Sequence, residues 1–115
     1  MADTEPVTPA HPQPVVVTLP AEIDMANARQ VRQRLYAALD AGAAIVVADM
    51  TATRFCDSTG LHALVLAHQR ATERGAELRV AVTSEGIRHV MAITKLDTVL
   101  RIYPSAGEAL TNGTG

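Results

Sequence analysis

Three small polar residues in a row, Asp57-Ser58-Thr59, form the segment of the sequence most suited to chemistry. They follow an apolar stretch and a loop, and they precede a stretch of helical periodicity that starts near Leu61. Each can accept hydrogen bonds from backbone N–H groups at a helix start, where a phosphoryl group is also favoured. The segment therefore has two interpretations: a simple helix cap, or a hydroxyl presented for phosphorylation.

The other reactive side chains point to structural roles. Cys56 is the only cysteine, so an intramolecular disulfide and a multi-cysteine metal site are excluded. A reactive thiol needs an electropositive setting, and only Arg54 is near in sequence, so we expect Cys56 to pack in the core. His62 and His68 are six residues apart and do not share a helical face, so no metal site is predicted.

The hydrophobic period changes repeatedly between two and about 3.6 residues, which indicates strands alternating with helices. Apolar or alternating segments predict strands over 15–19, 44–48, 77–82 and 99–103. Apolar stripes predict helices over 24–42, 61–75, 105–110 and from residue 84 onward. This order is typical of an α/β fold. We predict one domain with a four- to five-stranded, mostly parallel or mixed sheet packed with about four helices.

Sites in such sheets gather where strands end at their carboxyl edge, here at 20–24, 51–60 and 83–86. Asp24 suits the N-cap of the first helix, or alternatively a contact residue beside Asp57 and Ser58. We expect Met25 and Leu61 to be exposed at the same rim, where an apolar anchor suits a protein partner. The basic residues of the first helix, Arg29, Arg32 and Arg34, are expected on its solvated face, and Met50 and Met91 in the core.

Composition narrows the class of protein. Ten Lys and Arg against twelve Asp and Glu give a net charge of −2, which argues against a nucleic-acid or anionic-membrane surface. No apolar run is long enough for a membrane span, and the N-terminus lacks the pattern of a secretory signal, so we expect a cytoplasmic protein. The proline-rich segment 1–14 and the segment 111–115 are predicted to be flexible tails that flank a domain over 15–110.

Nothing in the sequence predicts an enzyme or a cofactor. No Gly-rich phosphate loop follows a strand, and no general base is identifiable near Asp57, Ser58 or Cys56. A small α/β enzyme that uses one of these residues stays as a third hypothesis. Nucleotide hydrolysis by the purified chain alone would favour it.

Four blocks of the sequence resemble the STAS domain, specifically the bacterial anti-sigma factor antagonists. Phe55-Cys56-Asp57-Ser58-Thr59-Gly60-Leu61 is similar to the family's Asp-Ser-Ser/Thr-Gly-Leu motif. Ala21-Glu22-Ile23-Asp24 resembles its Gly-Glu-Leu-Asp turn, with Ala21 in place of the glycine, and 46–50 resembles its central strand. The C-terminal blocks are 96–100 and 108–110, so the resemblance covers about residues 15–110. The family usually begins with a two-stranded hairpin, of which only 15–19 is recognisable here.

The resemblance implies a switch in transcription regulation. An unmodified antagonist binds an anti-sigma factor and so frees a sigma factor. The anti-sigma factor, often a serine kinase, phosphorylates the hydroxyl after the Asp, here Ser58 (second choice Thr59), and a phosphatase restores binding. The expected partner-binding residues are Asp24, Met25, Asn27, Asp57, Ser58, Thr59, Gly60, Leu61 and His62. The alternative is a STAS subunit that docks into another assembly, such as a lipid-transport or stress-signalling complex.

Overall fold

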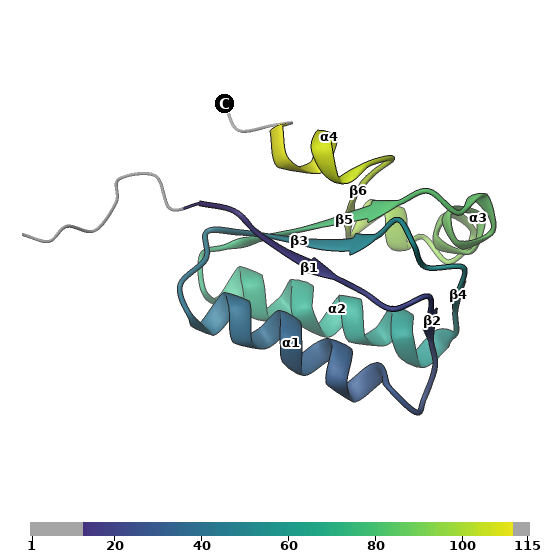
Figure 1. Cartoon of the computed structure of the whole chain (residues 1–115), viewed down its shortest axis with the longest axis horizontal. Coiled ribbons are helices and arrows are strands. Elements are labelled where there is room, and N and C mark those ends of the chain that lie inside the picture. Colours follow the sequence, from purple (N-terminus) through teal and green to yellow (C-terminus); the bar gives the residue numbers. More distant parts are fainter. Residues whose placement is uncertain (1–12, 112–115) are drawn as a thin grey trace, which may run out of the picture.

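The computed structural model describes residues 13–111, and Figure 1 shows how their strands and helices are arranged. Residues 1–12 and 112–115 belong to the two tails predicted from composition and lie outside the described residues. The last helix, α4 (Ala106–Thr111), includes one residue of the segment assigned to the C-terminal tail. The flexibility of the tails therefore stays a prediction.

The main sheet has four parallel strands in the order β1-β3-β5-β6. Their bounds are Val15–Thr18 for β1, Ile45–Met50 for β3, Glu77–Val82 for β5 and Arg101–Tyr103 for β6. The central pair, β3 and β5, is almost entirely buried, as the apolar run of β3 predicts for a strand covered on both faces. The predicted parallel α/β sheet is confirmed, and all strands end at the same edge.

Two long helices lie side by side on one face of the sheet, and the short helix α4 lies on the other (Figure 1). The long helices are α1 (Ala28–Asp40) and α2 (Ser58–Glu73). Their apolar stripes pack on the sheet and form the main core, in which Leu35, Leu64 and Met50 are fully buried. On the opposite face, Ala109 of α4 packs near Val47 and Ala81 in a smaller cluster.

A third helix, α3 (Glu85–Ile93), and a 3-10 helix (Leu96–Thr98) connect β5 to β6. The Ser84 hydroxyl caps α3 by accepting a hydrogen bond from the Ile87 backbone amide at 3.2 Å. Met91 is fully buried in the main core, so the prediction of core positions for Met50 and Met91 is confirmed.

A second, two-stranded parallel sheet joins the loops that follow β1 and β3. It consists of β2 (Glu22–Ile23) and β4 (Phe55–Cys56), which the sequence analysis treated as loop. Backbone hydrogen bonds extend the pairing, from the Arg54 amide to the Ala21 carbonyl at 2.7 Å and from the Asp57 amide to the Ile23 carbonyl at 3.0 Å. This pairing brings the segment around Asp24 beside the start of α2.

Among the described residues, β1 pairs with β3 alone, so it is the edge strand of the main sheet. The hairpin partner that usually precedes this strand in the family is not formed by residues 13–111. Val15 and Val16 are both exposed on this edge.

Candidate functional site

Asp57 is the N-cap of α2 and organises the polar segment. Its backbone is extended, with φ −85° and ψ −174°. Its carboxylate accepts hydrogen bonds from the amides of Thr59 at 2.9 Å and Gly60 at 3.2 Å, and the Thr59 hydroxyl donates to the same oxygen. These bonds satisfy backbone donors that a helix start leaves unpaired. The cap interpretation is therefore confirmed for Asp57.

The pKa of the Asp57 carboxyl lies below its ordinary value. The hydrogen bond from the Thr59 hydroxyl is the largest cause. Partial desolvation raises the pKa, but the backbone amides of Gly60, Thr59 and Met25 lower it further. Because all these donors stabilise the anion, Asp57 is ionised at neutral pH and places a fixed negative charge beside Ser58.

Ser58 and Thr59 are both exposed, but their hydroxyls differ in their bonding. The Thr59 hydroxyl is bound to Asp57, whereas the Ser58 hydroxyl makes no hydrogen bond to any residue in 13–111. Ser58 is the first residue of α2, so its side chain stands on a capped, regular helix. The hydroxyl of Ser58 is thus accessible and unengaged, while the proton of the Thr59 hydroxyl is held by the Asp57 carboxylate.

Gly60 allows α2 to lie against the small sheet. A Cβ atom at this position would lie 2.6 Å from the Cys56 Sγ and 2.7 Å from the Ile23 Cγ2, closer than real side chains approach. The absence of a side chain at Gly60 therefore permits the close approach of α2 to β2 and β4. Leu61, by contrast, is only 7% exposed and belongs to the core-facing stripe of α2, so the expectation that it is exposed is wrong. Gly60 and Leu61 therefore support the site from beneath.

Asp24 is not the cap of the first helix. Helix α1 begins at Ala28, with Asn27 in the N-cap position and without a side-chain cap hydrogen bond. Instead, the Asp24 carboxylate accepts a hydrogen bond from the Ala26 amide at 2.9 Å and so closes a tight turn. The side-chain amide of Asn27 stabilises this turn. Its oxygen accepts a hydrogen bond from the Asp24 backbone N–H at 3.0 Å, and its nitrogen donates one to the Glu22 carbonyl at 2.8 Å.

Two exposed apolar side chains accompany the polar segment. Met25 is 78% exposed, as predicted, and its backbone amide contacts Asp57. Phe55 is 52% exposed on β4, a position that the sequence analysis missed. The alternation of β4 is the signal that could have found it, because Cys56 faces the core and the residue before it must face outward. Large exposed apolar residues are typical anchors for protein partners.

Cys56 is half-buried and packs against the main core. Burial, with a smaller contribution from the charge of Asp57, raises the pKa of its thiol to about 12. A thiol with such a pKa stays protonated and is a poor nucleophile at neutral pH. The structural interpretation of Cys56 agrees with its position beneath Gly60.

The two histidines of α2 differ in their exposure. His62 is exposed near Ser58, whereas His68 is half-buried farther along α2. Within the described part of the chain, no three His, Cys, Asp or Glu side chains are grouped so that they could hold a metal ion. Among the helices of residues 13–111, none has the length and apolar character needed to cross a membrane.

A groove of about 360 Å³ opens beside Ser58, between the first turns of α1 and α2. Arg29 and Arg32 line it from α1, and Ser58 and His62 line it from α2. The expectation of a fully solvated arginine face holds for Arg29 and Arg34, but Arg32 is half-buried. The sequence pattern could not predict the partial burial of Arg32, because the polar residues of a helix have the same spacing whether they face water or a neighbouring helix.

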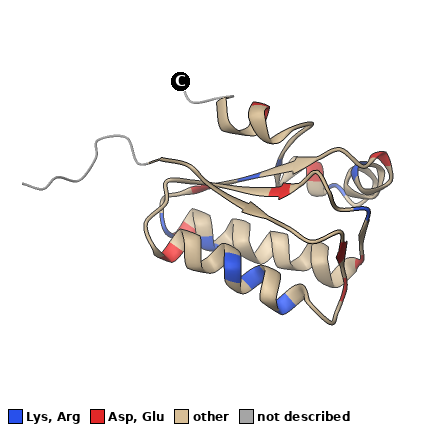
Figure 2. Cartoon of the chain, viewed as in Figure 1, with Lys and Arg blue, Asp and Glu red and all other residues tan. Residues whose placement is uncertain are grey.

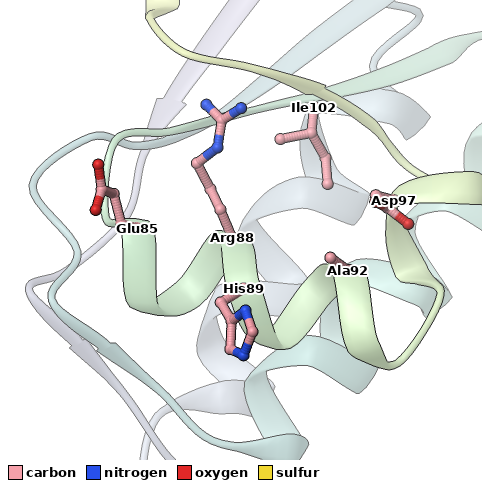
Figure 3. Close-up of a pocket in the computed structure, with 6 residues that line it drawn as sticks. All are labelled: Glu85, Arg88, His89, Ala92, Asp97 and Ile102. Atoms are coloured by element: carbon pink, nitrogen blue, oxygen red, sulfur yellow. The ribbon is translucent and has the colours of Figure 1, made fainter.

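A second hollow, of about 450 Å³, lies between α3, the 3-10 helix and β6 (Figure 3). Glu85, Arg88, His89 and Asp97 contribute polar groups to its lining. Figure 3 shows that these groups point in different directions: Arg88 extends toward the sheet, while the imidazole of His89 points to the other side. Since the groups do not converge on one point, they form no constellation for acid–base or nucleophilic chemistry.

Known proteins share both sequence features and the fold of this chain. The sequence profile of the STAS domain matches residues 5–109. A search of curated protein sequences gave no significant match. Among solved structures, an anti-sigma factor antagonist from Mycobacterium paratuberculosis superposes with a TM-score of 0.78 at 28% identity, over 88% of this chain and 86% of that one.

Two further structures share the fold at lower identity. The anti-sigma factor antagonist SpoIIAA in its unphosphorylated form matches with a TM-score of 0.64 at 19% identity, over 90% of this chain and 88% of that one. A sulfate transporter family protein from Wolinella succinogenes matches with a TM-score of 0.65 at 21% identity, over 91% and 86%. The profile match covers nearly the whole described region, with the Asp57-Ser58-Thr59 cap at the start of α2. The chain belongs to the STAS domain family.

Proposed function

We propose that the chain is an anti-sigma factor antagonist whose binding is switched off by phosphorylation of Ser58. The observation that carries the proposal is the state of the two hydroxyls: that of Ser58 is exposed and unbonded, whereas that of Thr59 is bound to Asp57. The structural similarity to an anti-sigma factor antagonist at 28% identity supports the choice of partner. Ser58 is therefore the acceptor and Thr59 a helix-start residue.

The binding surface in this proposal surrounds Ser58. Met25 and Phe55 supply apolar anchors, and the partner covers the start of α2 between them. The proposed contact set also includes Asp24, Asn27, Thr59 and His62, while Gly60 and Leu61 hold the helix in place. An interface with apolar anchors around a polar centre excludes water from Ser58, which makes the interface sensitive to a new charge there.

Phosphorylation adds a charge of about −1.5 to −2 at neutral pH. In the transfer, the Ser58 oxygen forms a bond to the terminal phosphorus of ATP held by the partner kinase. The bond from that phosphorus to ADP breaks, and the hydroxyl proton passes to a base of the kinase. The phosphoryl group then lies in the interface beside the ionised Asp57, so like-charge repulsion and desolvation weaken the complex. A phosphatase that hydrolyses the ester restores binding.

Affinity capture with three forms of the chain tests the proposal. The wild type and Ser58→Ala are expected to retain an anti-sigma factor with serine kinase activity toward this chain, identified by mass spectrometry, and Ser58→Asp is expected to lose it. Ser105→Asp is the matched control, because Ser105 also stands at a helix start, accepting from the Glu108 amide, but on the other face of the sheet. Its capture should equal that of the wild type.

Two results would contradict the proposal. Equal capture of one partner by all forms would make Ser58 only the first residue of a helix, and it would make the domain a constitutive docking module. Capture of an ATPase–permease complex in place of an anti-sigma factor would assign the chain to the alternative assembly.

A further inference from the structure

The groove beside Ser58 is built from two helices that run in the same direction. Arg29 and Arg32 are three residues apart on α1, and Ser58 and His62 are four apart on α2, so each pair shares one helical face. Helices α1 and α2 lie side by side (Figure 1). The two pairs of residues line one groove between these helices. Ser58 therefore lines the same groove as two arginines and a histidine.

The charges along the seam between α1 and α2 are balanced at one end and unbalanced at the other. At the far end, Asp40 of α1 forms ion pairs with Arg70 of α2 and with Arg74, which follows α2, both at 2.9 Å. At the Ser58 end, Arg29 and Arg32 form no ion pair with any acidic residue in 13–111, and no Asp or Glu lines the groove. Figure 2 shows the basic residues along α1.

Arg32 carries a buried donor without an acceptor. Its Nε atom is inaccessible to solvent and makes no hydrogen bond to the described residues. Its guanidinium carbon lies 5.7 Å from the centre of the Tyr36 ring. The face of this ring attracts the positive charge of Arg32, but it does not replace a hydrogen-bond acceptor for the Nε–H group. Buried donors of this kind are rare in folded proteins, and a bound water or ion that acts as acceptor is one of their explanations. An anion bound in the groove would give the guanidinium group of Arg32 an acceptor.

We propose that this groove receives the phosphoryl group of phosphorylated Ser58, which Arg29 and Arg32 bind within the same chain. This inference rests on the proposed phosphorylation of Ser58. Guanidinium groups bind phosphoryl oxygens through strong, charge-assisted hydrogen bonds, and the α2 N-terminus adds backbone dipoles of the favourable sign. Asp57 opposes the phosphoryl charge, but its carboxylate is held by Thr59 and Gly60 and does not line the groove. His62 is the remaining titratable group that faces it.

In the phosphorylated form, the phosphoryl group is therefore bound by arginines of its own chain. Phosphorylation would then act twice: it adds negative charge at the interface, and it removes the cationic groove from the surface that the partner meets. The phosphorylated chain should also be more stable than the unmodified one, because the new ion pairs bridge α1 and α2. Repulsion between the phosphoryl group and the partner would not by itself neutralise the cationic groove or raise the stability of the chain.

A phosphorus NMR titration tests the proposal on the full chain with phosphoserine incorporated genetically at position 58, so no kinase is needed. The second pKa of a free phosphoserine is about 6. Paired with two arginines, it should fall by about one pH unit, because nearby positive charge favours the dianion. The variant Arg32→Gln should lose most of this shift. Arg34→Gln is the matched control, since Arg34 is an exposed residue of the same helix that does not line this groove.

Thermal unfolding gives a second readout that does not depend on titration. Phosphoserine at position 58 should raise the Tm in the wild-type and Arg34→Gln chains, and Arg32→Gln should abolish the increase. Equal phosphorus pKa values in the Arg32→Gln and Arg34→Gln chains, with equal Tm increments, would overturn the proposal. Partner release is measured separately, so an arginine-dependent shift without release would instead reject the proposed function.

Discussion

The hydroxyl of Thr59 donates a hydrogen bond to the carboxylate of Asp57, the residue that caps the helix on which Thr59 stands. This bond is the largest cause of the lowered pKa of Asp57, and it engages one of two adjacent hydroxyls. The other hydroxyl, that of Ser58, is left exposed and unbonded among the described residues. One cap thus fixes the charge beside the proposed acceptor and engages the hydroxyl of Thr59 but not that of Ser58.

The lowered pKa of Asp57 makes part of the stability depend on pH. A group whose folded pKa lies below its unfolded value stabilises the fold above the unfolded value, here 3.8, and loses that contribution as the pH falls through the folded pKa. Asp57→Asn retains a cap but no charge. In urea unfolding, the wild type should therefore exceed the variant in stability at pH 7. The difference should decrease as the pH falls below 3.8 and through the lower folded pKa of Asp57. Other carboxylates, including Asp40, titrate in both proteins, so their contributions cancel in the difference between the two unfolding free energies. A difference independent of pH would contradict this account.

Gly60 is required by packing, so Gly60→Ala should destabilise the fold by about 1–3 kcal/mol, the usual cost of overpacking. The added Cβ would meet the Cys56 Sγ and the Ile23 Cγ2, both closer than 3 Å. The matched control is Gly86→Ala, in the first turn of α3, where the nearest atom is the Ser84 Oγ at 3.8 Å. That change should be neutral or stabilising, because alanine has the higher helix propensity. Equal effects of the two substitutions on the free energy of unfolding would show that Gly60 is not a packing glycine.

Local patterns in the sequence predicted much of this fold and the start of the site. The apolar run that contains Val46 and Val47 predicted a strand buried on both faces, and Asp57 was recognised as a helix cap because its type and position suffice for that role. The STAS resemblance was carried by the same residues, and it is confirmed by the profile match.

The features that the sequence did not predict depend on contacts between distant segments. Strands β2 and β4 have two residues each, too few to show any period, and they form because the loops after β1 and β3 pair with each other. Of the two interpretations of Asp24, the helix cap is wrong, because the side-chain amide of Asn27 closes the turn after Asp24 and helix α1 begins only at Ala28. Leu61 was expected at the surface, but a helix start at Ser58 turns it toward the core.

The apolar residues Met25 and Phe55 are predicted to anchor the partner. Alanine at either position should weaken partner binding about tenfold, since exposed anchors of this size typically contribute more than 1 kcal/mol to an interface. Both side chains are more than half exposed, so the Tm should change little. Ile93→Ala removes an apolar side chain that is 64% exposed on α3 and serves as the control. Isothermal titration with the captured partner measures the affinities, and a loss equal to that of Ile93→Ala would reject the assignment.

Cys56 should react slowly with thiol reagents. Burial and the charge of Asp57 raise its thiol pKa to about 12, so only a small fraction of thiolate is present at pH 8. Labelling with iodoacetamide, followed by intact mass, should be much slower in the native chain than in the urea-unfolded chain. Equal rates in the two states would show that the thiol is neither buried nor suppressed.

The most direct test of the central claim compares the affinity of the captured anti-sigma factor for two forms of the full chain. One form carries serine at position 58, and the other carries genetically incorporated phosphoserine there. We predict that the phosphorylated form binds at least about 100-fold more weakly, which corresponds to about 2.7 kcal/mol of lost binding free energy. An unchanged Kd would contradict the switch at Ser58.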